Sequence, residues 1–408
     1  MTSAEIIALL GSLLFAVSIM PGTLGVLLMT SKIAAKEWGA RLIYEKALWG
    51  MVAATALMIA AWIMAAQSGG ASLIMIGATL FYLGVAVFGF FMHTKFLFQP
   101  VTRPLYMSVD QALEKFGPEE EVVGVIDDNG TAWAYVARLA RRPHIVEQNE
   151  GAHPFMMTHC ILAHSSMAFA LEDKVARPDI TITSALANNL VFYEKNSKCS
   201  IVQAKNGSRA GELPLRMVPT IAVSLKTWKA MYPESKVWYR NKEWRDEFYL
   251  RLLARADVID PKSPVMVYPL VHGLDKRRPM KSMVTGVETK GQSRVYTMEH
   301  SQANPLIHDH LAGIDLLVAS GYDNDLIQVF GRKVDGKTLD FTSDGENHFI
   351  DTQTGSKWNL LGTCTDGPMK GKKLTLVPHY NKMFWYVWAD YHPGTEIYDP
   401  TVTAVAAE

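Results

Sequence analysis

The sequence carries no surplus of charge and few cysteines, and both absences restrict its function. Its 40 Lys and Arg residues balance 40 Asp and Glu residues, so the formal net charge at pH 7 is zero. Such a chain lacks the basic excess typical of nucleic-acid-binding proteins and the acidic tail typical of disordered ones. The three cysteines, Cys160, Cys199 and Cys364, form no disulfide framework, which is compatible with a reducing compartment.

Signatures of several large enzyme classes are also missing. The chain has no Gly-x-Ser-x-Gly nucleophile elbow, no Gly-x-Gly-x-x-Gly dinucleotide fingerprint and no His-Glu-x-x-His metalloprotease motif. These absences favour a protein that binds over a protein that catalyses.

What the chain does have is two long runs without charge, at residues 6–31 and 47–94. About 20 apolar residues cross a bilayer as a helix, so the first run predicts one span and the second predicts two. We expect helices near 6–29, 46–66 and 72–95, which together make residues 1–99 a three-helix transmembrane anchor. Charged groups are missing from the middle of each span, which argues against an ion path or proton relay through them.

Basic residues near the spans predict the orientation. The segments after the first and third helices carry all six nearby Lys and Arg residues: Lys32, Lys36, Arg41, Lys46, Lys95 and Arg103. Residues 1–5 and 67–71, on the other side, carry none. The positive-inside rule therefore predicts an integral protein of the bacterial inner membrane with its soluble part in the cytoplasm. The alternative is a periplasmic soluble part.

A repeated motif organises the soluble part. Residues 228–238 and 388–398 both follow the pattern Trp, four residues, Pro, three residues, a β-branched residue, an aromatic residue. The similarity extends upstream, where residues 211–219 resemble residues 371–378. The sequence thus predicts three transmembrane α-helices followed by a β-rich α+β tandem repeat. The expected boundaries are 100–240 for the first soluble repeat, 241–282 for a linker and 283–408 for the second, degenerate repeat.

Short β-branched and aromatic runs predict the strands of these repeats. They lie at 122–126, 132–135, 155–158, 190–193, 316–319, 326–330 and 374–377. Asp127–Gly130 and Val334–Gly336 are typical of hairpin turns, because Asn-Gly and Asp-Gly tolerate positive φ. We expect helices at 220–231, 246–256 and 381–391.

Several of these segments resemble a known family. They are Val123–Tyr135, Thr158–Cys160, Leu190–Tyr193 and Leu225–Pro233, and the resemblance covers nearly all of residues 108–399. The chain resembles the domain-of-unknown-function family 3179, and three leading helices with two such domains look like one of its subgroups. The resemblance implies no established activity. The family's Thr-Tyr-Cys-x-x-Cys motif is altered here, because Ala163 stands where the second cysteine is expected, so dithiol chemistry is excluded at this position.

The altered motif still leaves a possible metal site. A thiolate and imidazoles close in sequence can bind copper or zinc, and the candidate ligands are Cys160, His164, His159 and His144. A buried structural cysteine beside surface histidines is the competing interpretation. His300, His308 and His310 form a second candidate cluster, and Asp323 and Asp325 alternate like calcium ligands.

Three functional hypotheses follow. The first is a multi-pass membrane protein whose tandem soluble domains act as a non-catalytic binding module, an accessory or structural subunit of a membrane complex. Its expected partners are the lipid bilayer and other proteins or a second copy of itself, without nucleic acid. The alternative is a metal-binding or redox-associated membrane protein using the region of His159, Cys160 and His164. The third is an enzyme of unrecognised type with Asp127, Asp128 or His144 as acid–base groups.

Overall fold

The computed structural model describes residues 1–24, 33, 36–127, 129–149, 153–171, 180–205, 207–208, 215–252, 255–345 and 347–399. The chain divides into two compact units. We call the first the helical unit; it comprises Met1–Val101, Leu171–Leu215 and Trp244–Leu253. The second, the strand-rich unit, comprises Thr102–Ala170, Arg216–Glu243 and Ala254–Glu408. The predicted domain boundaries at 100, 241 and 283 stay predictions.

The helical unit contains the three predicted apolar helices. Its helices are α1 (Ser3–Leu24), α3 (Glu37–Arg41), a π-helical turn (Leu42–Lys46), α4 (Ala47–Gln67), α5 (Leu73–Met92) and α6 (Thr94–Leu97). The segments Ser3–Thr23, Glu37–Gln67 and Leu73–Met92 are long and apolar enough to cross a membrane. The prediction of three such helices is confirmed, and the expected end of the first helix, at residues 25–29, lies outside the described residues.

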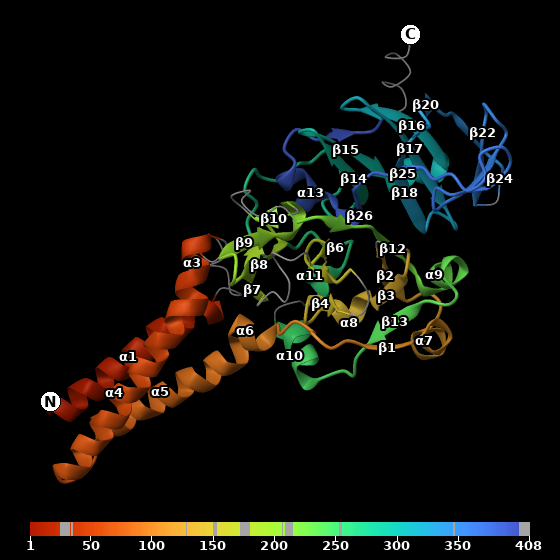
Figure 1. The fold of residues 1–408 in the computed structure, drawn as a ribbon. Helices are drawn as coiled ribbons and strands as arrows, with labels where there is room; N and C mark the ends of the chain where they lie inside the picture. The colour runs from red at the N-terminus through yellow and green to blue at the C-terminus, as the bar shows by residue number, and fades with distance from the viewer. Residues whose placement is uncertain are drawn as a thin grey trace. The chain divides into compact units, whose positions relative to one another are not determined.

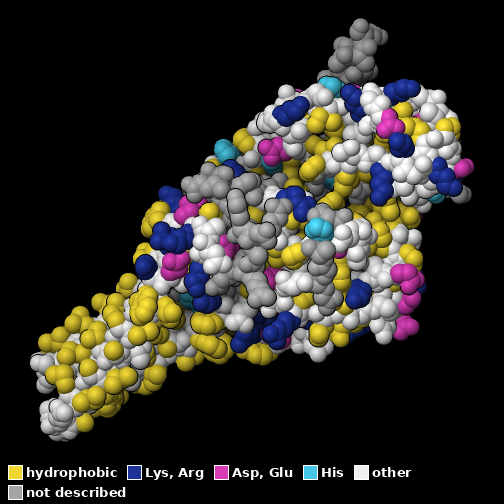
Figure 2. Space-filling model, in the orientation of Figure 1, with side chains coloured by type: hydrophobic (Ala, Val, Ile, Leu, Met, Phe, Trp, Pro, Cys, Tyr) yellow, Lys and Arg dark blue, Asp and Glu magenta, His cyan; other side chains and the backbone are white. Residues whose placement is uncertain are grey.

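Small residues and an apolar surface suit these helices to lipid. α1 packs along both α4 and α5 (Figure 1). Ala54, Ala61 and Ala65 of α4 are buried, and small residues at such contacts let helix backbones approach closely in a bilayer. Large side chains such as Leu13, Trp49 and Leu80 point outward instead, and Figure 2 shows hydrophobic side chains covering the visible surface of the helices.

A four-stranded antiparallel sheet belongs to the same unit. Its order is β10-β9-β8-β7, formed by β7 (Ile180–Leu186), β8 (Asn189–Glu194), β9 (Cys199–Val202) and β10 (Gly207–Ser208). The Tyr193 hydroxyl donates to Glu45 Oε1 at 2.6 Å, and the Tyr44 hydroxyl donates to the Thr183 carbonyl at 3.1 Å. These bonds join the sheet to the π-helical turn. Helix α10 (Trp244–Leu252) completes the unit.

The first half of the strand-rich unit contains two sheets, of order β1-β13-β3-β2-β12 and β11-β6-β5-β4. Their strands are β1 (Leu105–Ser108), β2 (Glu121–Ile126), β3 (Ala132–Val136), β4 (Ile145–Gln148), β5 (Phe155–Cys160), β6 (Ser165–Ala170), β11 (Met217–Val218), β12 (Thr220–Ser224) and β13 (Lys236–Tyr239). The helices are α7 (Val109–Phe116), α8 (Ala137–Ala140), α9 (Leu225–Met231) and α11 (Ala256–Ile259). Only the β13–β3 contact in the first sheet is parallel.

Within the described residues, the second half contains three four-stranded sheets and one hairpin. Two of the sheets have the orders β26-β14-β15-β27 and β16-β17-β18-β25. The hairpin β19-β20 and the sheet β21-β22-β23-β24 lie between β18 and β25 along the chain. The elements of the first two sheets are β14 (Met283–Thr289), β15 (Gln292–Thr297), α12 (Met298–Ala303), β16 (Leu306–Leu311), β17 (Ile314–Gly321), β18 (Leu326–Gly331), β25 (Thr375–Leu376), β26 (His379–Phe384), α13 (Trp385–Tyr391) and β27 (Glu396–Ile397). The others are β19 (Lys333–Val334), β20 (Lys337–Thr338), β21 (Phe341–Ser343), β22 (His348–Asp351), β23 (Lys357–Asn359) and β24 (Cys364–Asp366). The β27–β15 contact is parallel, as β13–β3 is.

One contact recurs in both halves, at the tryptophans of the repeated motif. Trp228 on α9 and Trp388 on α13 are fully buried, as the motif predicts. The Trp228 ring lies over Gly124 of β2, and the Trp388 ring lies over Gly286 of β14. The indole N–H of Trp228 donates to Ser235 Oγ at 2.8 Å, and that of Trp388 donates to Thr395 Oγ1 at 3.0 Å. Each motif therefore fixes a helix to a strand and to the turn that follows the helix.

The expected helices before these motifs begin too early. Thr220–Ser224 and Asn381–Phe384 were expected to be helical, but they belong to strands β12 and β26, and only residues 225–231 and 385–391 form helices. The reason is local in the first half: Thr220, Ile221 and Val223 are β-branched, and Ser224 then caps α9 by accepting the Thr227 N–H at 3.4 Å. The predicted helix at 246–256 corresponds to α10 and α11, with residues 253–254 outside the described residues.

We predict that Gly124→Ala and Gly286→Ala each destabilise the protein. A Cβ at residue 124 would lie 1.9 Å from the Trp228 ring, and one at residue 286 would lie 2.4 Å from the Trp388 ring. Because an indole fixed by a hydrogen bond has little room to move, each substitution should lower the free energy of unfolding by roughly 1–3 kcal/mol. Gly331→Ala is the matched control, since its nearest neighbour is 3.8 Å away. Equal melting temperatures for all three variants would contradict this account.

Candidate functional site

The four predicted metal ligands lie close in sequence but serve different contacts. His159 and Cys160 are the last residues of β5, and both are buried. Adjacent strand residues point to opposite faces of a sheet, so these two side chains diverge. The Nδ1–H of His144 donates to the His159 carbonyl at 2.9 Å, and His159 Nδ1 is hydrogen-bonded to Ser166 Oγ at 2.8 Å.

Burial keeps two of these histidines neutral. It lowers the pKa of His144 to about 4, and, together with the nearby charge of His164, it lowers the pKa of His159 to about 3. Across the part of the chain that the structure describes, no group of three or more His, Cys, Asp or Glu side chains could hold a metal ion. The copper or zinc site stays a prediction.

The second histidine cluster is also divided among separate partners. His308 Nε2 accepts the Phe341 N–H at 3.0 Å, and His310 Nδ1 lies 2.9 Å from Asp315 Oδ1.

Of the proposed acid–base groups, Asp127 shapes the β2–β3 turn, because its Oδ1 accepts the N–H groups of Asn129 and Thr131 at 2.9 Å each. Asp128 lies outside the described residues.

His164 leads to a different cluster of charges. Its Nε2 lies 3.3 Å from Glu121 Oε2, and its Nδ1–H donates to the Lys382 carbonyl at 3.0 Å. The Lys382 ammonium in turn lies 2.9 Å from Asp325 Oδ1, and Asp325 Oδ2 accepts the Ser224 N–H at 2.8 Å. We call these five residues the interface network, because β2, the β5–β6 turn and β12 of the first half meet the β17–β18 turn and β26 of the second half here.

The interface network holds opposite charges together. Burial alone raises the pKa of Glu121, but the His164 imidazolium and the Lys382 ammonium outweigh it and lower that pKa to about 2. Burial alone lowers the pKa of His164, but the Glu121 carboxylate outweighs it and raises that pKa. Glu121 is therefore ionised near neutral pH, and the His164 imidazole stays protonated to a higher pH than an isolated histidine. His164 and Lys382 also adopt the left-handed backbone conformation, with φ of 48° and 49°, a strained state for residues other than glycine.

Two turns of equal length make reciprocal contacts across this interface. The β5–β6 turn comprises residues 161–164, and its Ala163 carbonyl accepts the N–H of Phe384, the residue before α13. The β17–β18 turn comprises residues 322–325, and its Asp325 accepts the N–H of Ser224, the residue before α9. Each half thus holds the start of the other half's tryptophan helix.

Beside the β17–β18 turn the surface is hollowed by two adjoining cavities, of about 790 and 460 Å³. We call them together the α9 groove. Both cavities are lined by Lys226, Gln302, Tyr322, Asp323 and Asn324. Neutral hydroxyl and amide residues complete much of the larger one: Thr227, Ser301, Ser320, Ser343 and Asn347. The smaller one reaches Glu121, Asp325 and Lys382 of the interface network.

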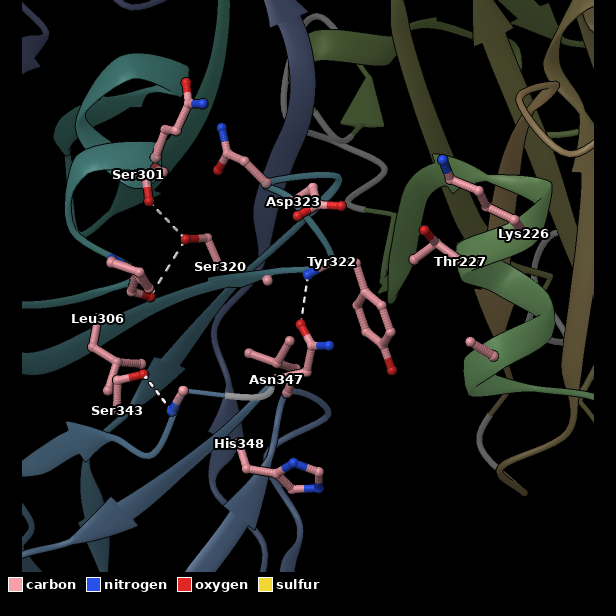
Figure 3. A pocket seen from close by; sticks show the side chains of 17 residues that line it. Lys226, Thr227, Ser301, Leu306, Ser320, Tyr322, Asp323, Ser343, Asn347 and His348 are labelled. Carbon is pink, nitrogen blue, oxygen red and sulfur yellow. Dashed lines mark hydrogen bonds between the residues drawn. The ribbon is translucent and has the colours of Figure 1, made fainter.

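The backbone of the turn holds Tyr322 in the groove. Tyr322, Asp323 and Asn324 have φ of 52°, 56° and 65°, three successive left-handed residues. The Tyr322 N–H donates to Asn347 Oδ1 at 2.6 Å, so this loop is fixed from the side of β22. Figure 3 shows the Tyr322 ring in the space between Asn347 and the α9 residues Lys226 and Thr227. In the sequence, only the alternation of Asp323 and Asp325 draws attention to this turn.

The segment from the end of β18 to β21 has the residue spacing of a phosphate-binding loop but does not form one. Gly331, Gly336, Lys337 and Thr338 have the Gly-x4-Gly-Lys-Thr spacing, which binds phosphate when a helix follows the loop. Here Val334 pairs with Lys337 in the β19–β20 hairpin, and Thr338 Oγ1 donates to Asp315 at 3.0 Å. The segment leads into β21 instead of a helix, so it has no helix N-terminus to offer a phosphate.

We predict that Glu121→Gln destabilises the protein most between about pH 4.5 and 6.5. Glu121 contributes stability above its ordinary pKa of 4.5 and loses it as the pH falls towards 2. His164 contributes fully below its ordinary pKa of 6.5 and loses this contribution as the pH rises through its raised value. The loss should be roughly 1–3 kcal/mol in the window and smaller on either side, measured by thermal unfolding at graded pH. Glu119→Gln, at an exposed neighbouring glutamate, should show no such window; a pH-independent loss in Glu121→Gln would contradict the pairing.

Comparisons with known proteins agree with the resemblance seen in the sequence. The model of the family described as "Protein of unknown function (DUF3179)" matches residues 99–395, well over half of the chain. Neither the curated proteins nor the solved structures contain a match. The matched segment includes the interface network and the α9 groove, and the chain belongs to the DUF3179 family.

Proposed function

We propose that the protein is a membrane-anchored, non-catalytic binding module whose α9 groove binds a neutral ligand rich in hydroxyl or amide groups. The observation that carries this proposal is the lining of the larger cavity. It has about 790 Å³, within the range of ligand pockets, and it combines one aromatic ring with many hydroxyl and amide side chains. Hydroxyl and amide groups both donate and accept hydrogen bonds, so they match a ligand of the same kind.

The charges around the groove support a neutral ligand. Glu119 pairs with Lys226 at 2.7 Å, Asp325 pairs with Lys382 at 2.9 Å, and Glu121 pairs with His164 at 3.3 Å. Paired in this way, these three carboxylates and their partners largely cancel one another's charge, and Asp323 adds one further carboxylate to the wall. Specificity then depends on hydrogen bonds and on the Tyr322 ring.

We also infer that the two halves of the strand-rich unit are copies of one fold. Three observations support this inference: the equal strand order of β13-β3-β2-β12 and β27-β15-β14-β26, the parallel pairs β13–β3 and β27–β15, and the glycine beneath each tryptophan. In this proposal the second copy has lost the cysteine motif, and its β17–β18 turn has become the wall of a groove. A ligand in the groove contacts both copies at once.

The same proposal gives the protein an accessory role in a membrane complex, with protein partners or a second copy of the chain. It puts the strand-rich unit in the cytoplasm, because six Lys and Arg residues follow the first and third helices and none lies on the other side.

We predict that Lys226→Gln weakens ligand binding and that Lys229→Gln does not. Both lysines lie on α9 and both pair with one carboxylate, Glu119 or Asp110, but only Lys226 lines the groove. Loss of one charged hydrogen-bond donor should raise Kd roughly tenfold or more. The full chain in nanodiscs is first screened by thermal shift against neutral oligosaccharides and uncharged tripeptides, and binding is then measured by calorimetry. Stabilisation by charged compounds alone, or equal losses in the two variants, would overturn the proposal.

We predict that reporter fusions place the carboxyl terminus in the cytoplasm. Green fluorescent protein at the carboxyl terminus should fluoresce, and alkaline phosphatase there should be inactive, because the latter folds only outside the cytoplasm. Fusions at Gly70, in the segment between α4 and α5, should give the reverse result. Active phosphatase at the carboxyl terminus would place the strand-rich unit in the periplasm.

A further inference from the structure

A second cavity, in the helical unit, differs in kind from the α9 groove. It has about 770 Å³ and lies between α5 and α10. Gly84, Phe88 and Phe91 line it from α5, and Trp244 and Phe248 line it from α10; the remaining lining residues are Leu, Val and Met. Four of its side chains are thus aromatic, and none of its lining residues is charged.

Aromatic contacts hold α10 against the end of α5. The Phe91 and Trp244 rings meet edge to face, with centroids 5.5 Å apart. Beyond α5, the Phe98 and Tyr249 rings make a similar contact at 5.0 Å, and Arg245 Nη1 donates to the Phe96 carbonyl at 3.4 Å. With nine residues and several charges, α10 is too short and too polar to cross a bilayer.

The position of the cavity restricts what can enter it. Its α5 wall belongs to a segment able to span a membrane, so the bilayer is the source of apolar molecules at this place. Hydrocarbon alone can satisfy a cavity whose walls offer almost no polar partner. Tryptophan is favoured at the membrane–water interface, and Trp244 is 59% exposed.

Two cationic side chains lie near the carboxyl end of α5, a helix that lines the cavity. Lys95 is exposed on α6, three residues after Met92, the last residue of α5. The Arg245 guanidinium lies 5.7 Å from the centroid of the Trp244 ring that lines the cavity. Cations at the level of the headgroups attract anionic lipids.

We propose that the cavity between α5 and α10 binds an acyl chain of an anionic phospholipid, with the phosphate beside Lys95 and Arg245. The lipid then fills the space between a membrane helix and a surface helix, and it stabilises the contact between them. This site is independent of the α9 groove, because each is lined by residues of a different unit.

A cavity-filling substitution tests the acyl-chain site. A Cβ at Gly84 has no neighbour within 4 Å, so Gly84→Phe can fill the cavity without disturbing the helix. Gly77→Phe is the matched control: it lies seven residues earlier on α5, also has open space, and does not line the cavity. Native mass spectrometry of the full chain, delipidated in detergent and titrated with phosphatidylglycerol, should show retained lipid falling at least severalfold in Gly84→Phe alone. Equal retention in the two variants would overturn the site.

A second pair of variants tests the headgroup. Arg245→Gln should reduce the preference for phosphatidylglycerol over phosphatidylcholine by about fivefold. Arg251→Gln, on the same helix but paired with Glu247, should leave the preference unchanged. Equal binding of the two lipids by the unaltered protein would contradict an anionic headgroup site. It would mean that the cavity binds acyl chains whatever their headgroup.

Discussion

An indole lying on a strand glycine is the contact on which the strand-rich unit depends. In each half it joins the helix after β12 or β26 to the neighbouring inner strand, β2 or β14, and no side chain larger than hydrogen fits beneath it. The indole N–H then fixes the turn that leads to the parallel strand, β13 or β27, through Ser235 or Thr395. A single aromatic residue thus sets the direction of its helix and the return of the chain to the sheet.

The direction of these helices in turn positions the interface between the halves. Because α9 and α13 follow the edge strands β12 and β26, the N–H of the residue before each helix can be held by a turn of the other half, and the two contacts are reciprocal. The core is continuous across this interface, since Trp228 and Val223 belong to the same buried cluster as Leu317 and Trp358. Strain at His164 and Lys382 is tolerated here because the ion pairs of the interface network hold both residues. The same ion pairs offset charges at the edge of the groove.

The sequence predicted what depends on local pattern. Uncharged runs identified the three apolar helices, and the tryptophan spacing identified two buried anchors. β-branched and aromatic runs identified seven of the strands, namely β2, β3, β5, β8, β17, β18 and β25. It failed where a helix begins directly after a strand, because no glycine or proline separates the two in Thr220–Ser224 or Asn381–Phe384, and only Ser224 provides a capping side chain. The predicted metal site at Cys160 followed from the family motif. The interface network could not be predicted in this way, because it joins residues up to 261 positions apart, from Glu121 to Lys382, and no local pattern links them. Nothing in the sequence predicts that β7–β10 group with the membrane helices.

The central claim is that the α9 groove is where the protein meets its ligand. Hydrogen–deuterium exchange of the full chain in nanodiscs, with and without the neutral compound that raises its melting temperature most, tests this claim directly. We predict slower exchange in the β17–β18 turn, from Gly321 to Leu326, and in α9, because bound ligand contacts both and suppresses their local opening. Slower exchange confined to β7–β10 or to the outer strands, with the turn and α9 unchanged, would show that the ligand binds elsewhere and would contradict the account.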